Sequence, residues 1–249
     1  RRVLFRSKKY GKGRERKTEI KLFDTIQAKN VAIANTKLYA NFADGFIGTS
    51  LKKDEFIVEC SDLDDIIAFT KGGIMKVVRV FDKVFIGKDI LHVAVFQKND
   101  ERTTYNMIYV DGKTGGSFAK RFNVTGITRD KEYDLTKGSE RSKVHYFSAN
   151  ANGEAEQVKI TLSPNCSARN KELDFYFEEL EIKGRNSIGN QVTKYPIKSV
   201  KFKEAGKSTL SAKKMWFDDK FGRLNTEEKG DYLGRSEEHT SELQSHSDL

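Results

Sequence analysis

Short apolar runs separated by Gly, Asn and Asp recur along this chain, and they predict β-hairpins. One such unit extends from Ile67 to Val80, where apolar-rich runs flank a turn at Lys71-Gly72-Gly73. A second extends from Met107 to Phe122 around Asp111-Gly112-Lys113. Runs of four to eight residues rich in β-branched and aromatic side chains, joined by a Gly-containing turn, are typical of a hairpin.

Four further turns of this kind are predicted at Asn35-Thr36, Asn152-Gly153, Lys183-Gly184 and Asp218-Asp219. With turn centres at 36, 72, 112, 152, 184 and 219, the spacings are 36, 40, 40, 32 and 35 residues. A period near 40 built from strands indicates blades of a propeller-like array. No helical pattern of ten or more residues follows residue 30. We therefore expect an all-β fold with about five to six four-stranded blades.

Both ends of the chain differ from the rest. Residues 1–7 and 235–249 resemble a translated sequencing adapter read on opposite strands, so we set them aside as artefactual. Residues 8–25 are polar and basic, with two glycines, and we interpret them as a linker from a missing upstream domain. The array then occupies residues 26–234. We expect it to be a truncated piece of a longer protein.

The net charge of the chain indicates which kind of partner it could bind. The chain of 249 residues carries a formal net charge of +9, spread along its length, which suits a polyanion such as DNA or RNA. No apolar run approaches the ~20 residues of a membrane span, and no signal peptide is recognisable. The two cysteines, Cys60 and Cys166, form no CxxC motif and indicate reduced thiols in the cytoplasm.

Cations on the second strands and turns are the candidate binding residues. If equivalent positions of successive blades face one edge, they form a curved track that contacts phosphates with little sequence preference. The alternative is an ordinary solvated strand face. The candidate DNA-binding residues are Lys52, Lys53, Lys71, Lys76, Arg79, Lys113, Lys120, Arg121, Lys183, Arg185 and Lys194.

The chain shows no pattern that argues for catalysis or metal binding. Asp62, Asp64 and Asp65 share one short loop without matching ligands nearby. His92 and His145 lie in strand-like runs, and no Ser, Cys and His have the spacing of a nucleophile and its base. The paired glycines precede no helix or GKS/GKT run, so they form turns rather than a phosphate loop. We therefore predict no catalytic residue, no metal and no cofactor in this chain.

Several segments of the chain form recognisable motifs: Lys12–Ile20, Phe23–Ile26, Asp44–Phe56, Phe69–Gly73, Val124–Leu135, Trp216–Asp218 and Gly230–Gly234. In their order and spacing these motifs resemble the C-terminal domains of the A subunits of bacterial gyrase and topoisomerase IV. The match spans nearly all of residues 8–234.

The resemblance implies a β-pinwheel, in which neighbouring blades exchange strands and DNA bends around a basic outer edge. It implies a parent ATP-dependent type II topoisomerase whose active-site tyrosine lies in an upstream Arg-Tyr-Thr setting. That tripeptide is absent here, so this fragment is not expected to be catalytic by itself, and ATP and Mg²⁺ belong to other parts of the enzyme. Its expected partners are duplex DNA, the B subunit of the topoisomerase, and a second A subunit, in the bacterial cytoplasm at the nucleoid.

Two alternatives stay open. The first is a gyrase-type wrapping domain. Gyrases carry an arginine-containing glycine box, whereas residues 44–52 here keep Gly45 and Gly48 without an arginine run, which favours topoisomerase IV. The second is a protein-interaction propeller, because a basic edge would also bind acidic proteins.

Overall fold

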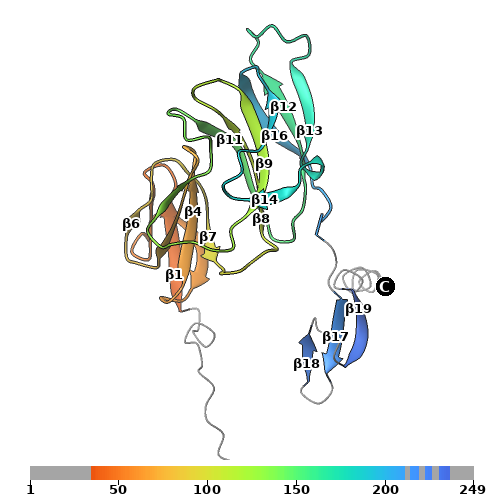
Figure 1. The fold of residues 1–249 in the computed structure, drawn as a ribbon. Helices are drawn as coiled ribbons and strands as arrows, with labels where there is room; N and C mark the ends of the chain where they lie inside the picture. The colour runs from red at the N-terminus through yellow and green to blue at the C-terminus, as the bar shows by residue number, and fades with distance from the viewer. Residues whose placement is uncertain (1–34, 211–213, 219–221, 226–229, 236–249) are drawn as a thin grey trace, which may run out of the picture.

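The computed structural model describes residues 35–210, 214–218, 222–225 and 230–235, and these residues are almost entirely strands and turns (Figure 1). The only helical element in them is a single 3-10 turn, η2 (Phe177–Glu179). None of the helical structure in these ranges is long and apolar enough to cross a bilayer. The all-β prediction is confirmed. The predicted head, linker and tail lie outside the described residues, except Arg235.

Five sheets follow one another along the described chain. The first contains β1 (Thr36–Asn41), β2 (Phe46–Gly48), β3 (Glu55–Cys60) and β6 (Val84–Phe85). The second contains β4 (Asp65–Thr70), β5 (Ile74–Arg79), β7 (Ile90–Phe96) and β10 (Glu132–Asp134). The third contains β8 (Thr104–Val110), β9 (Ser117–Asn123), β11 (Lys143–Asn150), β14 (Ile182–Gly184) and β15 (Asn190–Thr193).

The remaining two sheets have three strands each in the described residues. The fourth contains β12 (Gln157–Leu162), β13 (Glu172–Tyr176) and β16 (Ile197–Glu204). The fifth contains β17 (Lys214–Asp218), β18 (Arg223–Asn225) and β19 (Asp231–Arg235). In all five, the first strand of a hairpin pairs with the second on one side and with a later strand on the other.

The first three sheets each borrow a strand from farther along the chain. β6 follows the β4–β5 hairpin but returns to pair with β2, with Phe46 opposite Phe85. β10 follows the β8–β9 hairpin but pairs with β5, with Glu132 opposite Lys76. β14 follows the β12–β13 hairpin and pairs with β9 in parallel, and β15 adds antiparallel pairing to the same strand. This exchange ties each sheet to the next and is the pinwheel arrangement.

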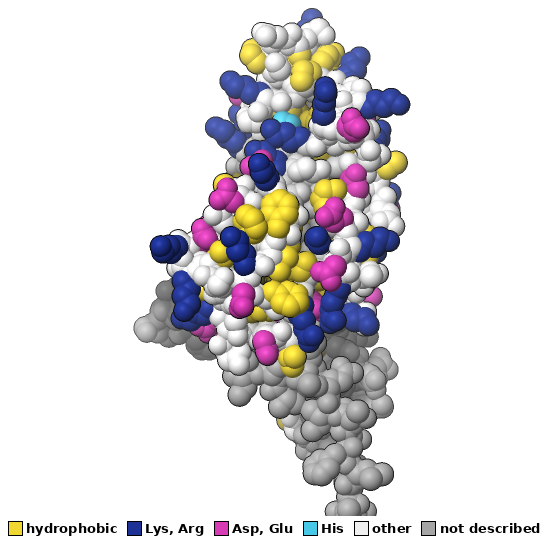
Figure 2. Space-filling model, turned by 90° about the vertical axis from the view of Figure 1, so that its left-hand side faces the viewer, with side chains coloured by type: hydrophobic (Ala, Val, Ile, Leu, Met, Phe, Trp, Pro, Cys, Tyr) yellow, Lys and Arg dark blue, Asp and Glu magenta, His cyan; other side chains and the backbone are white. Residues whose placement is uncertain are grey.

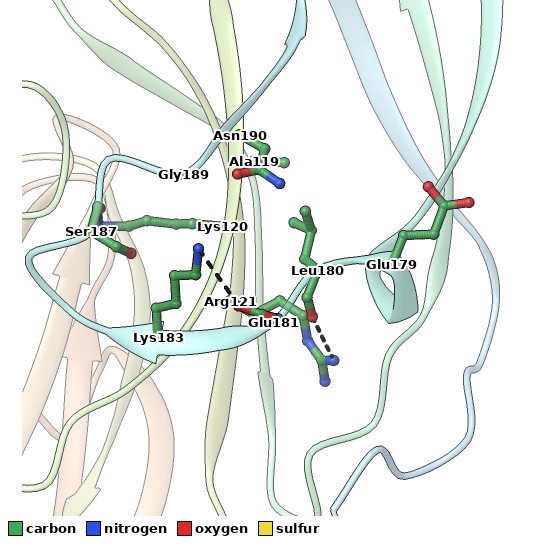
Figure 3. A pocket seen from close by; sticks show the side chains of 10 residues that line it. All are labelled: Ala119, Lys120, Arg121, Glu179, Leu180, Glu181, Lys183, Ser187, Gly189 and Asn190. Carbon is green, nitrogen blue, oxygen red and sulfur yellow. Dashed lines mark hydrogen bonds and ion pairs between the residues drawn. The ribbon is translucent and has the colours of Figure 1, made fainter.

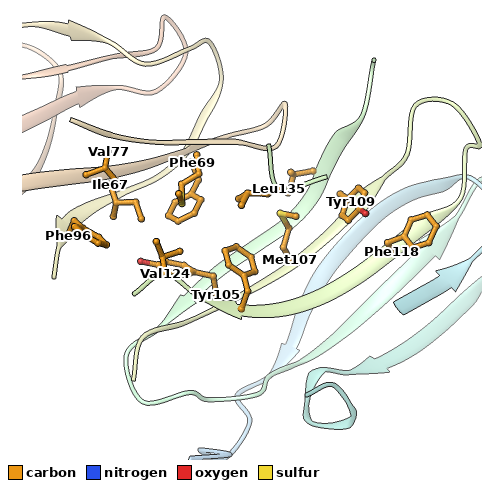
Figure 4. Packing of buried hydrophobic residues seen from close by; sticks show 13 residues of the cluster. Ile67, Phe69, Val77, Phe96, Tyr105, Met107, Tyr109, Phe118, Val124 and Leu135 are labelled. Carbon is orange, nitrogen blue, oxygen red and sulfur yellow. The ribbon is translucent and has the colours of Figure 1, made fainter. Parts of the chain in front are cut away.

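The sheets stack in chain order through three apolar layers. β4 is buried on both faces because Ile66 packs toward the first sheet, while Ile67 and Phe69 pack toward the third. Figure 4 shows the second of these layers, where Phe69 faces Tyr105 and Met107. The third layer joins Ile108 and Ala119 to Val158, Ile160 and Leu162. Burial on both faces explains why the middle strands are apolar without clean alternation.

Three predicted hairpin turns are wrong. Thr36 opens β1, and the first hairpin turns at residues 42–45 instead. Asn152 and Gly153 connect β11 to β12, which belong to different sheets. Lys183 and Gly184 belong to the exchanged strand β14, and the fourth hairpin turns between β12 and β13. Connectors and exchanged strands use the same Gly and Asn residues as hairpin turns, so composition alone cannot tell them apart.

Candidate nucleic-acid interface

The turns of the first hairpins are pressed against connectors from later in the chain. Gly45 has φ +82°, and a Cβ added there would lie 2.0 Å from the carbonyl oxygen of Gly87. Gly73 also has φ +82°, and its Cβ would lie 2.4 Å from Cγ2 of Thr136. Only glycine fits a left-handed position with so little space. The exchanged strands therefore bring their flanking connectors directly onto the turns.

Further backbone contacts hold the turn of the second hairpin between neighbouring connectors. The Lys71 amide donates a 2.8 Å hydrogen bond to the carbonyl of Asp89, and the Lys71 carbonyl accepts one of 2.8 Å from the amide of Val144. In the third hairpin, a Cβ on Gly112 would lie 1.9 Å from the carbonyl oxygen of Glu140. Turns and connectors thus alternate along one edge of the first three sheets.

Six cations lie on these turns and connectors, and we call them the hairpin rim. Five are exposed and Lys71 is half-buried. In the described part of the chain none of the six forms a salt bridge. Figure 2 shows Lys and Arg side chains crowded around a histidine in the upper part of the face turned toward the viewer. The hairpin rim consists of Lys71, Lys88, Lys113, Lys137, Arg141 and Lys143.

Local structure holds several of these cations in place. The Lys137 Nζ lies 3.8 Å from the centre of the Phe118 ring, a cation–π contact. Arg141 has φ +64° and Asp89, next to Lys88, has φ +55°, both in the left-handed region that non-glycine residues avoid. Such backbone strain concentrates at functional sites.

The pKa of His145 is sensitive to two lysines of the rim. Burial lowers the pKa of its imidazole, and the nearby Lys143 and Lys71 lower that pKa further. The two lysines come from different sheets, so the effect places their positive fields together. Burial disfavours a charge of either sign on the imidazole, whereas the two lysines disfavour only a positive one.

Of the cations chosen from sequence, Lys71 and Lys113 belong to the rim. Arg79 is exposed at the end of β5 away from its turn. The other exposed candidates lie on loops outside the rim, and their role in binding stays a prediction. They are Lys52, Lys53 and Lys194.

Three other candidates are engaged by the protein itself. The Lys76 Nζ lies 3.4 Å from Oε1 of Glu132, and its side chain is only 18% exposed. Lys183 lies 3.7 Å from the carboxylate of Glu181. The Arg185 guanidinium stacks 4.4 Å from the centre of the Tyr133 ring and donates to the Gly126 carbonyl. Lys76 and Arg185 thus connect strands and loops, so they are less available to phosphates than the rim, whereas Lys183 pairs only with a neighbour in the sequence and stays 55% exposed.

The prediction that Lys120 and Arg121 lie on an exposed track is wrong. Their exposed fractions are 2% and 1%. The Lys120 Nζ donates to the carbonyls of Arg185 at 2.9 Å and Ser187 at 3.0 Å, and burial lowers its pKa to about 8. Arg121 donates to Asn106 at 3.0 Å. It also donates to the carbonyl of Leu180 at 3.4 Å (Figure 3). Both faces of β9 are covered by neighbouring sheets or connectors, so both side chains point into protein.

The pocket in Figure 3 lies beside these two residues. Its volume is about 270 Å³, and it is lined by β9 and by the connector that carries β14. Glu179 and Glu181 share the walls with Lys183, so its charge is mixed. Across the described ranges, no three His, Cys, Asp or Glu side chains converge as a metal site would require. We therefore place the candidate interface on the rim rather than in this pocket.

The rim belongs to a segment that matches known proteins. The family model described as the topoisomerase C-terminal domain of Bacteroidota matches residues 37–204. The A subunit of DNA topoisomerase 4 of Borreliella burgdorferi is 32% identical over 202 residues, which cover 78% of this chain and 29% of that protein. The chain thus spans 29% of the length of that relative. The crystal structure of the C-terminal domain of DNA topoisomerase IV is similar with a TM-score of 0.48 and 13% identity, over 72% of this chain and 62% of that one.

Proposed function

We propose that this chain, which belongs to the family of bacterial topoisomerase C-terminal domains, binds duplex DNA through the phosphates that contact its hairpin rim. The observation that carries the proposal is a continuous edge of six cations, free of salt bridges in the described residues, on turns and connectors of three stacked sheets.

The chemistry of the rim fits a phosphate backbone better than base edges. Its donors are mainly lysine ammonium groups on short turns, which contact charged oxygens but do not reach deeply into a groove. Such contacts release counterions and position a duplex while carrying little sequence information. We therefore infer binding that weakens steeply with salt and hardly depends on sequence.

In the parent enzyme the domain would guide a DNA segment toward the gate of an ATP-dependent type IIA topoisomerase. The tyrosine that cuts DNA, the ATP site and the Mg²⁺ site would lie in other parts of that enzyme. Its working partners would be the B subunit of the enzyme together with a second A subunit, in the bacterial cytoplasm at the nucleoid. The resemblance of residues 8–234 to the A subunits of topoisomerase IV supports this role.

Fluorescence anisotropy with short labelled duplexes tests the proposal. Two duplexes of unrelated sequence should bind with similar affinity at about 50 mM salt, and both should weaken by orders of magnitude at about 200 mM. Absence of binding at low salt would refute the proposal. An acidic protein that binds in place of DNA and survives high salt would instead favour the protein-interaction propeller.

A further inference from the structure

A cleft of about 380 Å³ lies between β7 of the second sheet and the strands β8 and β11 of the third. It is at the end of the strands away from the hairpin rim. β8 begins at Thr104 beside the cleft and ends at Val110, just before the turn that carries Lys113. Since a strand rises about 3.4 Å per residue, roughly 20 Å separate the cleft from that turn. The residues that line the cleft include His92, Ala94, Phe96, Asp100, Tyr105 and Ala149.

Small side chains leave this space open between the two sheets. Ala94 on β7 and Ala149 on β11 line the cleft, and neither side chain extends beyond its Cβ. Elsewhere in the same layer, larger side chains such as Phe69 fill the gap. Figure 4 shows Phe96 and Tyr105 toward one end of this layer. Because protein interiors are closely packed, a gap of this size between two sheets is a place where a further molecule fits.

The hydroxyl of Tyr105 has no hydrogen-bond partner within the described ranges. The residue is only 6% exposed, and it lines the cleft. Burial raises the pKa of the hydroxyl and the Asp100 carboxylate raises it further, so the group stays protonated. A buried tyrosine hydroxyl usually finds a partner, and an unpaired one loses the hydrogen bonds that water would give it. It is therefore a donor that a bound molecule could satisfy.

The other polar groups of the cleft are neutral or balanced. The His92 ring lies 6.4 Å from that of Tyr105 and forms no hydrogen bond in the described part of the chain. Burial lowers the pKa of His92, so near pH 7 the imidazole offers one donor and one acceptor nitrogen. Asp100 accepts from two backbone amides of its own loop at 2.8 and 3.2 Å, and Arg102 donates to Asn152 at 3.1 Å. These two opposite charges cancel, so the lining carries no net charge.

We propose that this cleft binds a small, uncharged, planar aromatic molecule that carries a hydrogen-bond acceptor, such as an aromatic amide or a nucleobase-like heterocycle. The acceptor would take the proton of the Tyr105 hydroxyl, and a donor on the same edge would meet the free nitrogen of His92. The ring would lie among Ala94, Phe96 and Ala149. A charged molecule would lose hydration without gaining an unpaired opposite charge, so the cleft disfavours it.

An NMR titration of the full chain with nicotinamide, which is neutral and planar and has an amide oxygen, tests the proposal. The methyl signals of Ala94 and Ala149 should shift saturably, with a dissociation constant on the order of 1 mM for so small a ligand. Nicotinate and the N-methylpyridinium form of nicotinamide carry a negative and a positive charge on nearly the same frame. Both should bind roughly tenfold more weakly or worse. No saturable shift with nicotinamide, or equal binding of all three probes, would overturn the proposal.

Two variants test the roles of the hydroxyl and of the open space. Tyr105→Phe should weaken nicotinamide binding roughly tenfold, yet it should not lower the melting temperature, because the protein loses no hydrogen bond of its own. Tyr176→Phe, which is 40% exposed on the fourth sheet, is the matched control and should leave the affinity unchanged. Ala149→Leu, at an exposed position of β11, should fill the cleft and abolish the shift of Ala94. Unchanged binding in Tyr105→Phe or Ala149→Leu, or a lower melting temperature for Tyr105→Phe, would contradict the proposal.

Discussion

Neutralising half of the hairpin rim is the sharpest test of the DNA interface. Replacing Lys113, Arg141 and Lys143 with Gln removes three exposed positive charges and keeps side chains of moderate length. None of the three forms a salt bridge in the described residues, so the fold loses little. Gln and Arg are both L-residues, so the left-handed backbone at position 141, with φ +64°, costs about the same for either.

The magnitude follows from the number of phosphates contacted. If each of the six rim cations neutralises one phosphate, log K should fall against log salt with a slope of about −5, and affinity should drop about 10³-fold between 50 and 200 mM. The triple variant would contact three phosphates, which gives a slope of about −2.7 and a loss of about 40-fold over the same range.

Anisotropy titrations at four or five salt concentrations measure both slopes. The matched control is Lys198→Gln, Lys201→Gln, Lys207→Gln, which makes the same change in net charge at exposed sites on or just after β16. The control should keep the steeper slope. Equal slopes for the two triple variants would show that the whole surface, rather than the rim, attracts DNA, and would refute the reasoning.

Three further predictions concern stability. Arg121→Met removes the guanidinium that donates to Oδ1 of Asn106 and to the carbonyl of Leu180, so urea denaturation should show a loss of about 3 kcal/mol, whereas Lys183→Met should change stability by less than about 0.5 kcal/mol. Gly45→Ala and Gly112→Ala force a Cβ onto backbone carbonyls and should lower the melting temperature, while Gly126→Ala, with nothing within 4 Å, should not. Burial lowers the folded-state pKa of both His92 and His145, so the unfolded chain binds more protons. Stability should therefore fall as the pH drops below about 6.5, and replacing both histidines with Gln should flatten that decline.

The sequence locates the turns of two of the hairpins, the one between β4 and β5 and the one between β8 and β9. The turns at Gly72 and Gly112 are located correctly because each joins two apolar runs that pair with each other. The exchanged strands are different. β6 has two residues and β10 has three, and each pairs with a strand that lies far back in the chain. Their partners are set by stacking of whole sheets, which no local pattern records.

The error at Lys120 and Arg121 has a signal in the pattern of β9 itself. Phe118, Ala119 and Phe122 surround them in that strand, so apolar residues occur on both of its faces. A strand that is apolar on both faces is buried on both, and its cations must then find partners inside. Two of the four rim cations that sequence reasoning missed lie beside glycines, since Lys88 follows Gly87 and Lys137 precedes Gly138.

Strand exchange also explains why the sequence could not show which rim cations lie next to one another. Lys88 reaches the first turn only because β6 returns to the first sheet, and Lys143 lies near Lys71 because Val144 donates to the Lys71 carbonyl. The hydrogen bonds that join neighbouring sheets therefore also set the spacing of the charges. A DNA path along the rim would be as fixed as the stack itself, so the fold would determine how the duplex bends, while the individual lysines would determine how tightly it is held.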